Sequence, residues 1–261
     1  MPSRLANQWV LITGASSGIG EAAARAFGAE GCNLLLGARR ADKLQAAAAA
    51  AKKSGAASAH VHELDVASTP SVEAFVKWVL TLTPRVDVLI NNAGGAHGLD
   101  TVAEGKDADW VAMVESNLLG LLRVTRAVLP LMLPHKAGTI LSIGSIAGRQ
   151  SYEGGSVYCA VKAAELSITK TLRLELNGTG LRVGTVDPGA VHTEFAYTRY
   201  KGDNARALKT YEGLTPLTGE DVAEALVWAA SRPPHVCIDE ILMMCTDQAA
   251  VYKFYRRTAG K

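Results

Sequence analysis

The sequence predicts a single α/β domain with a doubly wound, seven-stranded and mainly parallel sheet and helices on both faces. Three observations predict it. Short apolar runs of strand length alternate with longer amphipathic stretches, which is typical of βαβ units. A glycine-rich segment follows the first run and opens a helical stretch. The chain has 261 residues, 48% of them hydrophobic, and shows no linker, so one domain over residues 1–261 can bury one large core.

Strands and helices are assigned from the same alternation. The expected strands are Val10–Thr13, Asn33–Gly37, His60–Leu64, Val86–Ile90, Thr139–Ile143, Arg182–Val186 and Ile238–Met243. Helices are expected between them. The segment Ala46–Ala51 is low in complexity, but the high helix propensity of alanine favours a surface helix over disorder.

Two longer helical stretches, Asp107–Leu133 and Ser156–Asn177, carry apolar residues on more than one face. The additional apolar faces must be buried somewhere. They pack either entirely within one chain or partly against a second subunit, so a homo-oligomer is one of the two interpretations.

Charge and cysteine usage exclude several classes of protein. The net charge of +2 is small and dispersed, which argues against a nucleic-acid partner. No apolar stretch is long enough for a membrane span, and no signal peptide is evident. The cysteines lack metal-binding spacing, so we expect no metal site and reduced, mostly buried thiols in a cytoplasmic protein. These cysteines are Cys32, Cys159, Cys237 and Cys245.

The glycine-rich segment after the first strand reads Gly14-Ala15-Ser16-Ser17-Gly18-Ile19-Gly20. Glycines between a strand and a helix allow backbone amides to approach a pyrophosphate and direct the positive end of the helix towards it. A plain glycine-rich turn is the alternative. The spacing also differs from the usual Gly-x-Gly-x-x-Gly fingerprint, but its position favours dinucleotide binding.

Tyr158 and Lys162 lie one helical turn apart, so both are expected on one face of a helix. An ammonium group near a phenol favours the phenolate, which makes Tyr158 a candidate general acid and base. Ser145 follows an apolar run and would stand at a strand end, where its hydroxyl can bind a carbonyl oxygen. The three residues suit the interconversion of carbonyl and alcohol.

Taken together, these motifs and several others resemble the short-chain dehydrogenase/reductase family along nearly the whole chain, which implies a Rossmann domain. The motifs are Thr13-Gly14-x-x-x-Gly18-Ile19-Gly20, Asn91-Asn92-Ala93-Gly94, Asn117, Ser145, Tyr158-x-x-x-Lys162 and Pro188-Gly189. The resemblance implies that Ser145 polarises the substrate oxygen and that Tyr158 exchanges the proton. It also implies that Lys162 assists Tyr158 and holds the nicotinamide ribose, and that Asn117 anchors a water.

Two of these assignments have alternatives. Without the resemblance, Asn117 is read as an amide that kinks its helix. Ser142 could compete for the role of catalytic serine, although its spacing to Tyr158 favours Ser145.

The end of the second strand indicates the cofactor. Ala38 stands where an NAD enzyme of this architecture usually presents a carboxylate, and Arg39 and Arg40 follow it. Guanidinium groups bind phosphate well, which favours NADP(H). The alternative is that both arginines are solvated at a helix start.

Further cofactor contacts follow from the resemblance. Asp65 would accept a hydrogen bond from the adenine amine, and the segments after the fourth and sixth strands would hold the ribose and the nicotinamide. The complete expected set is Gly14, Ser16, Ser17, Gly18, Ile19, Gly20, Arg39, Arg40, Asp65, Val66, Asn92, Ala93, Gly94, Tyr158, Lys162, Pro188, Gly189, Val191 and Thr193.

Within this family, the C-terminal part resembles the NADP-dependent 3-hydroxy acid dehydrogenases, which oxidise L-allo-threonine and L-serine. The matching segments include Thr193-Glu194-Phe195, Tyr200-Lys201-Gly202-Asp203 and Pro216-Leu217-Thr218-Gly219. A substrate carboxylate needs a cationic or amide partner. The candidates are Arg149, His192, Arg199 and Lys201.

Residues 195–215 are expected to form a mobile lid. The resemblance also implies a tetramer. A broad carbonyl reductase and a non-catalytic NADPH sensor are the competing functions, and the sequence leaves the physiological substrate and the direction of reaction open.

Overall fold

The computed structural model describes residues 3–257 and contains a seven-stranded sheet in which every pair of neighbours is parallel. The strand order is β3-β2-β1-β4-β5-β6-β7, so the direction of winding changes between β1 and β4. The strands are β1 Trp9–Thr13, β2 Asn33–Ala38, β3 Ser58–Glu63, β4 Val88–Asn91, β5 Gly138–Ile143, β6 Leu181–Pro188 and β7 Glu240–Met243. The predicted doubly wound Rossmann domain is confirmed, and each predicted strand overlaps an observed one.

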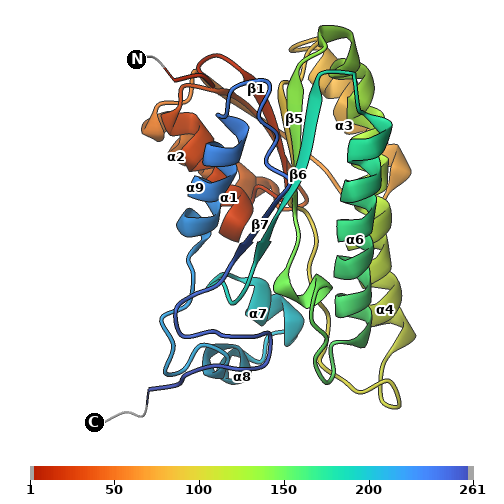
Figure 1. Cartoon of the computed structure of the whole chain (residues 1–261), viewed down its shortest axis with the longest axis vertical. Coiled ribbons are helices and arrows are strands. Elements are labelled where there is room, and N and C mark those ends of the chain that lie inside the picture. The colour runs from red at the N-terminus through yellow and green to blue at the C-terminus, as the bar shows by residue number, and fades with distance from the viewer. Residues whose placement is uncertain (1–2, 258–261) are drawn as a thin grey trace.

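Helices cover both faces of the sheet. They are α1 Gly18–Ala29, α2 Ala41–Ser54, α3 Thr69–Leu80, α4 Asp107–Met113, α5 Gly120–Val128, α6 Ser156–Glu175, α7 Phe195–Arg199, α8 Asn204–Lys209 and α9 Gly219–Ala230. Figure 1 shows α1, α2 and α9 on one side of the sheet and α3, α4 and α6 on the other. The short helices α7 and α8 lie beyond the carboxyl ends of β6 and β7.

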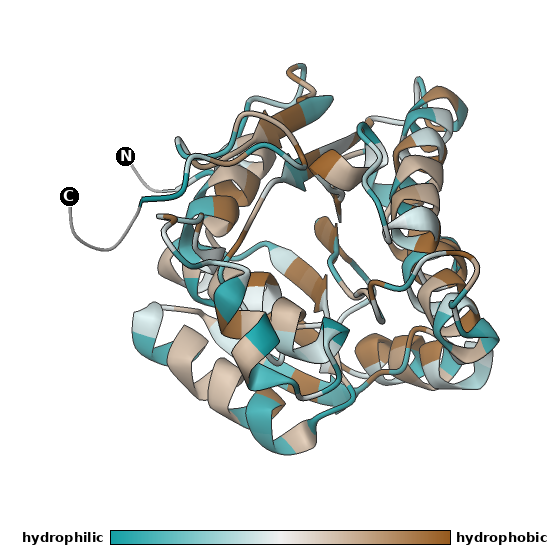
Figure 2. Cartoon of the chain, turned by 90° about the horizontal axis from the view of Figure 1, so that it is seen from below, coloured by the Kyte–Doolittle hydropathy of each residue, from teal (hydrophilic) through white to brown (hydrophobic). Residues whose placement is uncertain are grey.

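The central strands are buried on both faces, which explains why their sequences read as continuous apolar runs. In β1, Val10 and Ile12 point into the core beneath α1 and α9, while Leu11 points into the core on the opposite face. Seen from below, strands with apolar residues lie in the middle and helices of mixed polarity surround them (Figure 2).

The expected long helix Asp107–Leu133 is interrupted, and in this respect the prediction was wrong. Between α4 and α5 lies a π-helical turn, Val114–Leu119, and two 3-10 turns follow α5. The Asn117 side chain donates to the carbonyl of Met113 (2.8 Å), an oxygen that a regular helix would use for a backbone bond. Pro130 and Pro134 lie at the starts of the 3-10 turns and cannot continue the helical ladder.

The alanine-rich segment is helical, as predicted, but it is not a purely surface helix. It lies inside α2, where Ala47, Ala48 and Ala51 are buried against α1 and the sheet. Three of the four cysteines are buried, and only Cys237 is exposed. Within residues 3–257, no helix is long and apolar enough to cross a membrane, and no cluster of side chains has the composition of a metal site.

Candidate active site

The carboxyl ends of β1 and β4 are joined by side-chain hydrogen bonds at the point where the winding changes. The Thr13 hydroxyl accepts from the amides of Asn92 and Ala93, both at 3.0 Å. The side-chain amide of Asn92 in turn donates to the backbone carbonyls of Thr13 and Gly14. The glycine-rich turn and the segment Asn91–Gly94 therefore form one rigid edge, where ligands bind in open α/β sheets.

The glycines of the turn are required by its geometry. Gly14 has a φ of +67°, which residues with a side chain rarely adopt. A Cβ on Gly20 would lie 2.4 Å from the Gly14 carbonyl oxygen and 2.5 Å from the Asn92 amide nitrogen. This close approach places the first turn of α1 against β1, with its amide groups at the sheet edge.

Arg40 lies beside the glycine-rich turn, as a ribose-phosphate site requires. Its Nη2 donates to the hydroxyls of Ser17 (2.6 Å) and Ser16 (3.2 Å), and its Nη1 donates to Glu194 (2.7 Å). Lys43, one helical turn further along α2, bonds to the other oxygen of Glu194. Arg39 is exposed and has no ion pair within residues 3–257.

Lys43 was not among the sequence candidates for this phosphate region. Its position three residues after Arg40 at the start of a helix would have indicated it. The place of Glu194 could not be predicted from the sequence, because it depends on a contact between the α2 start and the segment after β6.

Tyr158 and Lys162 are both buried on the inner face of α6, with 9% and 8% of their surface exposed. The Lys162 ammonium donates to the carbonyl of Ile143 at the end of β5 (2.8 Å) and to the carboxylate of Glu165 (2.7 Å). Burial raises the pKa of Glu165 to about 7, against the opposing charge of Lys162. Glu165 was not among the sequence candidates, although a glutamate on the apolar face of α6 was the available signal.

Ser145 lies directly after β5 and caps the 3-10 turn Ile146–Gly148, where its hydroxyl accepts from the Ala147 amide (3.1 Å). Its rival Ser142 is buried and accepts from the Thr169 hydroxyl of α6 (3.2 Å). Ser142 is therefore committed to the core between β5 and α6, whereas Ser145 stands at the sheet edge.

Asn117 combines both sequence interpretations, because it shapes its helix and also faces the sheet edge. Its amide donates to the Gly95 carbonyl (2.9 Å), and its oxygen accepts from the Gly95 amide (3.1 Å). A Cβ on Gly94 would lie 2.5 Å from that oxygen. The π-helical turn thus holds Asn117 against the loop that follows β4.

The remaining cofactor candidates line the same edge. Asp65 accepts from the Ala67 amide (3.0 Å), while Ser68 provides the cap of α3, so Asp65 is not needed as a helix cap. Val66 packs against the helix residue Gly120. Thr193 lies beside Gly18, where an added Cβ would lie 3.1 Å from the threonine Cβ.

After β6, the Gly189 amide donates to the Met243 carbonyl (2.8 Å). Further along this segment, Val191 forms a bridge with Leu217. Pro188 is the last residue of β6.

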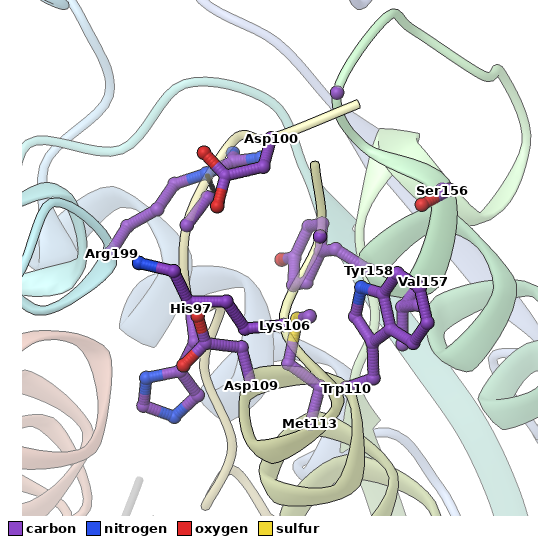
Figure 3. A pocket seen from close by; sticks show the side chains of 13 residues that line it. His97, Asp100, Lys106, Asp109, Trp110, Met113, Ser156, Val157, Tyr158 and Arg199 are labelled. Atoms are coloured by element: carbon purple, nitrogen blue, oxygen red, sulfur yellow. Dashed lines mark hydrogen bonds between the residues drawn. The ribbon is translucent and has the colours of Figure 1, made fainter. Parts of the chain in front are cut away.

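A pocket opens next to Tyr158. Figure 3 shows Tyr158 with Trp110 and Met113 of α4 on one side and Arg199 of α7 reaching in from the other. The guanidinium carbon of Arg199 lies 5.7 Å from the centre of the Tyr158 ring. Phe195, also on α7, packs against the same ring, with centroids 5.5 Å apart. The pocket therefore has an apolar wall and a cation beside the candidate proton donor.

Of the four cations proposed for a substrate carboxylate, only Arg199 lines this pocket. Arg149 donates to Asp187 and Glu240, and Lys201 is paired with Asp109 (2.7 Å). His192 is exposed and packs against Tyr211 with the two rings tilted. Arg199 donates through Nε to the Gly98 carbonyl (3.0 Å), and its Nη2 is buried without a hydrogen-bond partner in the described part of the chain.

The model of the family described as short chain dehydrogenase matches residues 8–204. The chain belongs to this family. A relative from Schizosaccharomyces pombe, named NADP-dependent 3-hydroxy acid dehydrogenase, is 40% identical over 258 residues, which cover 98% of this chain and all of the relative. A relative from Chromohalobacter salexigens, named sulfoacetaldehyde reductase 2, is 41% identical over 92% of this chain and 95% of its own length.

Among solved structures, the closed form of serine dehydrogenase complexed with NADP+ superposes with a TM-score of 0.89 at 36% identity, covering 96% of this chain and all of that one. The chain is therefore an oxidoreductase of the short-chain dehydrogenase family, and these relatives match between 92% and 98% of it. The resemblance drawn from the sequence motifs is confirmed at the level of the family.

Proposed function

We propose that this short-chain dehydrogenase is an NADP-dependent oxidoreductase that interconverts a small 3-hydroxy acid, or a β-hydroxy amino acid, and the corresponding carbonyl compound. The observation that carries the proposal is Arg199, a cation with an unpaired buried nitrogen in the pocket of Tyr158. A guanidinium nitrogen left without a partner in a partly apolar pocket fits a carboxylate. The names of the relatives support the same class of substrate.

In the proposed mechanism, the substrate carboxylate binds Arg199 and its 3-hydroxyl group faces Tyr158. Ser145 donates a hydrogen bond to the substrate oxygen, and Tyr158 accepts the hydroxyl proton during oxidation or returns it during reduction. Lys162 stabilises the phenolate by its charge, and Asn117 holds the loop after β4 and anchors a water at the end of the proton path.

The residues around the glycine-rich turn fit NADP(H), which supplies the hydride acceptor or donor. Ala38 leaves no carboxylate at the end of β2, and Arg40 and Lys43 provide two cations beside two serine hydroxyls. Arg39 is exposed and lies between the end of β2 and Arg40. The absence of a carboxylate at the end of β2 and the presence of these donors favour a phosphorylated ribose over an unmodified one.

The first experiment measures NADP+ reduction by the purified protein with L-allo-threonine and L-serine, with NAD+ in parallel. We expect turnover with NADP+ and at least about tenfold less with NAD+, since a charge-assisted phosphate contact contributes about 1.5–3 kcal/mol. Turnover only with uncharged ketones or aldehydes would instead support a broad carbonyl reductase, which the apolar contact of Phe195 with Tyr158 also suits.

Replacing Arg199 by methionine is expected to raise KM for a 3-hydroxy acid by about 10- to 100-fold, because the carboxylate loses a charge-assisted hydrogen bond. The KM of an uncharged alcohol should change little. Steady-state kinetics with both substrates measure the difference. Lys201→Met is the matched control, since Lys201 forms an ion pair with Asp109 and does not line the pocket. An equal loss with both substrates would assign Arg199 a structural role instead.

We further propose that residues 195–215 act as a lid, because they contain α7 with both Phe195 and Arg199.

A homo-oligomer, expected to be a tetramer, is supported by exposed apolar side chains on α4, α5 and α6, namely Val111, Leu122 and Leu174. The lack of a disulfide among the described residues agrees with the proposed cytoplasmic location.

A further inference from the structure

Glu194 lies between the cofactor region and the lid. It is the residue directly before α7. Its two carboxylate oxygens bind two different cations, Arg40, which caps the start of α2, and Lys43, which lies in α2. Oε2 accepts from Arg40 (2.7 Å) and Oε1 accepts from Lys43 (2.5 Å). Arg40 uses its other terminal nitrogen for Ser16 and Ser17. Two cations therefore hold one anion, and one of these cations also binds two hydroxyls.

This arrangement is an anion site whose present occupant belongs to the chain itself. Hydrogen bonds from Lys43 and Arg40 lower the pKa of Glu194 to about 2, so the carboxylate stays ionised at any pH at which the enzyme works. The side chains of Glu194, Arg40 and Lys43 are each between 42% and 44% exposed. An incoming anion can therefore reach the cations without unfolding any part of the core.

We propose that Glu194 is an affinity-determining residue that competes with the ribose phosphate of the cofactor for Arg40 and Lys43. A phosphate monoester carries close to two negative charges and three acceptor oxygens, against one charge and two oxygens for the carboxylate. The phosphate therefore displaces Glu194. Because exposed ion pairs contribute little individually, the carboxylate reduces the affinity for the phosphate only modestly and does not block the site.

The competition also couples cofactor binding to the substrate pocket. Glu194 is joined directly to α7, whose Phe195 packs on Tyr158 and whose Arg199 lines the pocket. While Glu194 holds the cations, the start of α7 is tied to α2. Its displacement by phosphate releases the start of the lid from α2. This step rests on the proposed function, since it requires a phosphorylated dinucleotide.

The test compares two nucleotides, 2′,5′-ADP and 5′-AMP, which differ only in the 2′-phosphate of the ribose. Isothermal titration calorimetry measures the Kd of each for the wild type and for Glu194→Gln. We expect the substitution to tighten 2′,5′-ADP by about fivefold, as the loss of two exposed pairs implies, and to leave 5′-AMP unchanged. Glu220→Gln is the matched control, because it removes the same charge from an exposed glutamate paired with Arg25.

Hydrogen exchange of residues 195–215 gives a second readout that does not depend on turnover. Exchange in the wild type should become faster when 2′,5′-ADP is added, and Glu194→Gln should exchange faster without any nucleotide. An unchanged or weaker affinity of Glu194→Gln for 2′,5′-ADP would overturn the competition, since it would show that Glu194 orients Arg40. In that case the NADP assignment would stand. A wild type that does not prefer 2′,5′-ADP over 5′-AMP would overturn both.

Discussion

Replacing Tyr158 by phenylalanine is expected to lower turnover by about 10³-fold while NADPH binding is retained. The substitution removes only the hydroxyl that exchanges the proton, and general acid–base catalysis of this kind contributes about 10²- to 10⁴-fold. The ring keeps its packing against Phe195, and the Lys162 bonds to Ile143 and Glu165 do not involve the phenol. Steady-state kinetics and NADPH fluorescence measure the two effects separately.

Tyr152→Phe is the matched control for this variant. Tyr152 also contacts the Arg199 guanidinium, and burial raises the pKa of its phenol to about 12, so it stays protonated and cannot serve as a base near neutral pH. We expect its kcat to change by less than about threefold, because this phenol does not exchange the substrate proton. Full activity of Tyr158→Phe, or an equal loss in both variants, would refute the assigned mechanism.

The elements that sequence reasoning located correctly are those determined by local pattern. The strand Trp9–Thr13 is apolar from Val10 to Ile12 because both of its faces are covered, and such a run is recognisable without a structure. The turn from Gly14 to Gly20 requires glycine for its backbone geometry, so its composition also reveals it. Local chemistry thus predicted the sheet and its ligand-binding edge.

The features that sequence reasoning missed depend on contacts between distant segments. The π-helical turn holds Asn117 against Gly95, and nothing near Asn117 in the sequence indicates that partner. Likewise, the four candidate cations for a carboxylate look equivalent in the sequence. The structure separates them, because the partners Asp187 and Glu240 neutralise Arg149, while Arg199 retains an unpaired nitrogen.

The second large effect is expected from the buried pair of Lys162 and Glu165. Their side chains are only 9% and 3% exposed, and the charged atoms lie 2.7 Å apart. Burial disfavours the charged form of Lys162, but the neighbouring carboxylate outweighs it and raises the lysine pKa. One further charge, Asp187 of β6, acts on the pair, and Arg149 holds that carboxylate. Each member of the pair therefore compensates the burial of the other.

Lys162→Met is expected to lower the free energy of unfolding by about 3–5 kcal/mol, because it leaves a carboxyl group buried without its cation. The double variant Lys162→Met/Glu165→Leu should regain most of that loss, since two apolar side chains replace the pair. Urea denaturation of the wild type, both single variants and the double variant completes a double-mutant cycle. Additive losses would show that the two groups do not interact.

The pH dependence of the free energy of unfolding identifies Glu165 as the group whose burial destabilises the Lys162→Met variant. Because the pKa of Glu165 is raised to about 7 in the folded protein, from about 4.3 in the unfolded chain, the folded state binds its proton more tightly. Raising the pH through that window removes stabilisation, and above it the wild-type carboxylate is held by Lys162. In Lys162→Met the cation is gone, so the pKa of Glu165 rises further and stability should continue to fall between about pH 7 and 9. The double variant has no carboxylate at this position and should show no such decline, so parallel curves for the single and double variants would exclude Glu165 as the source.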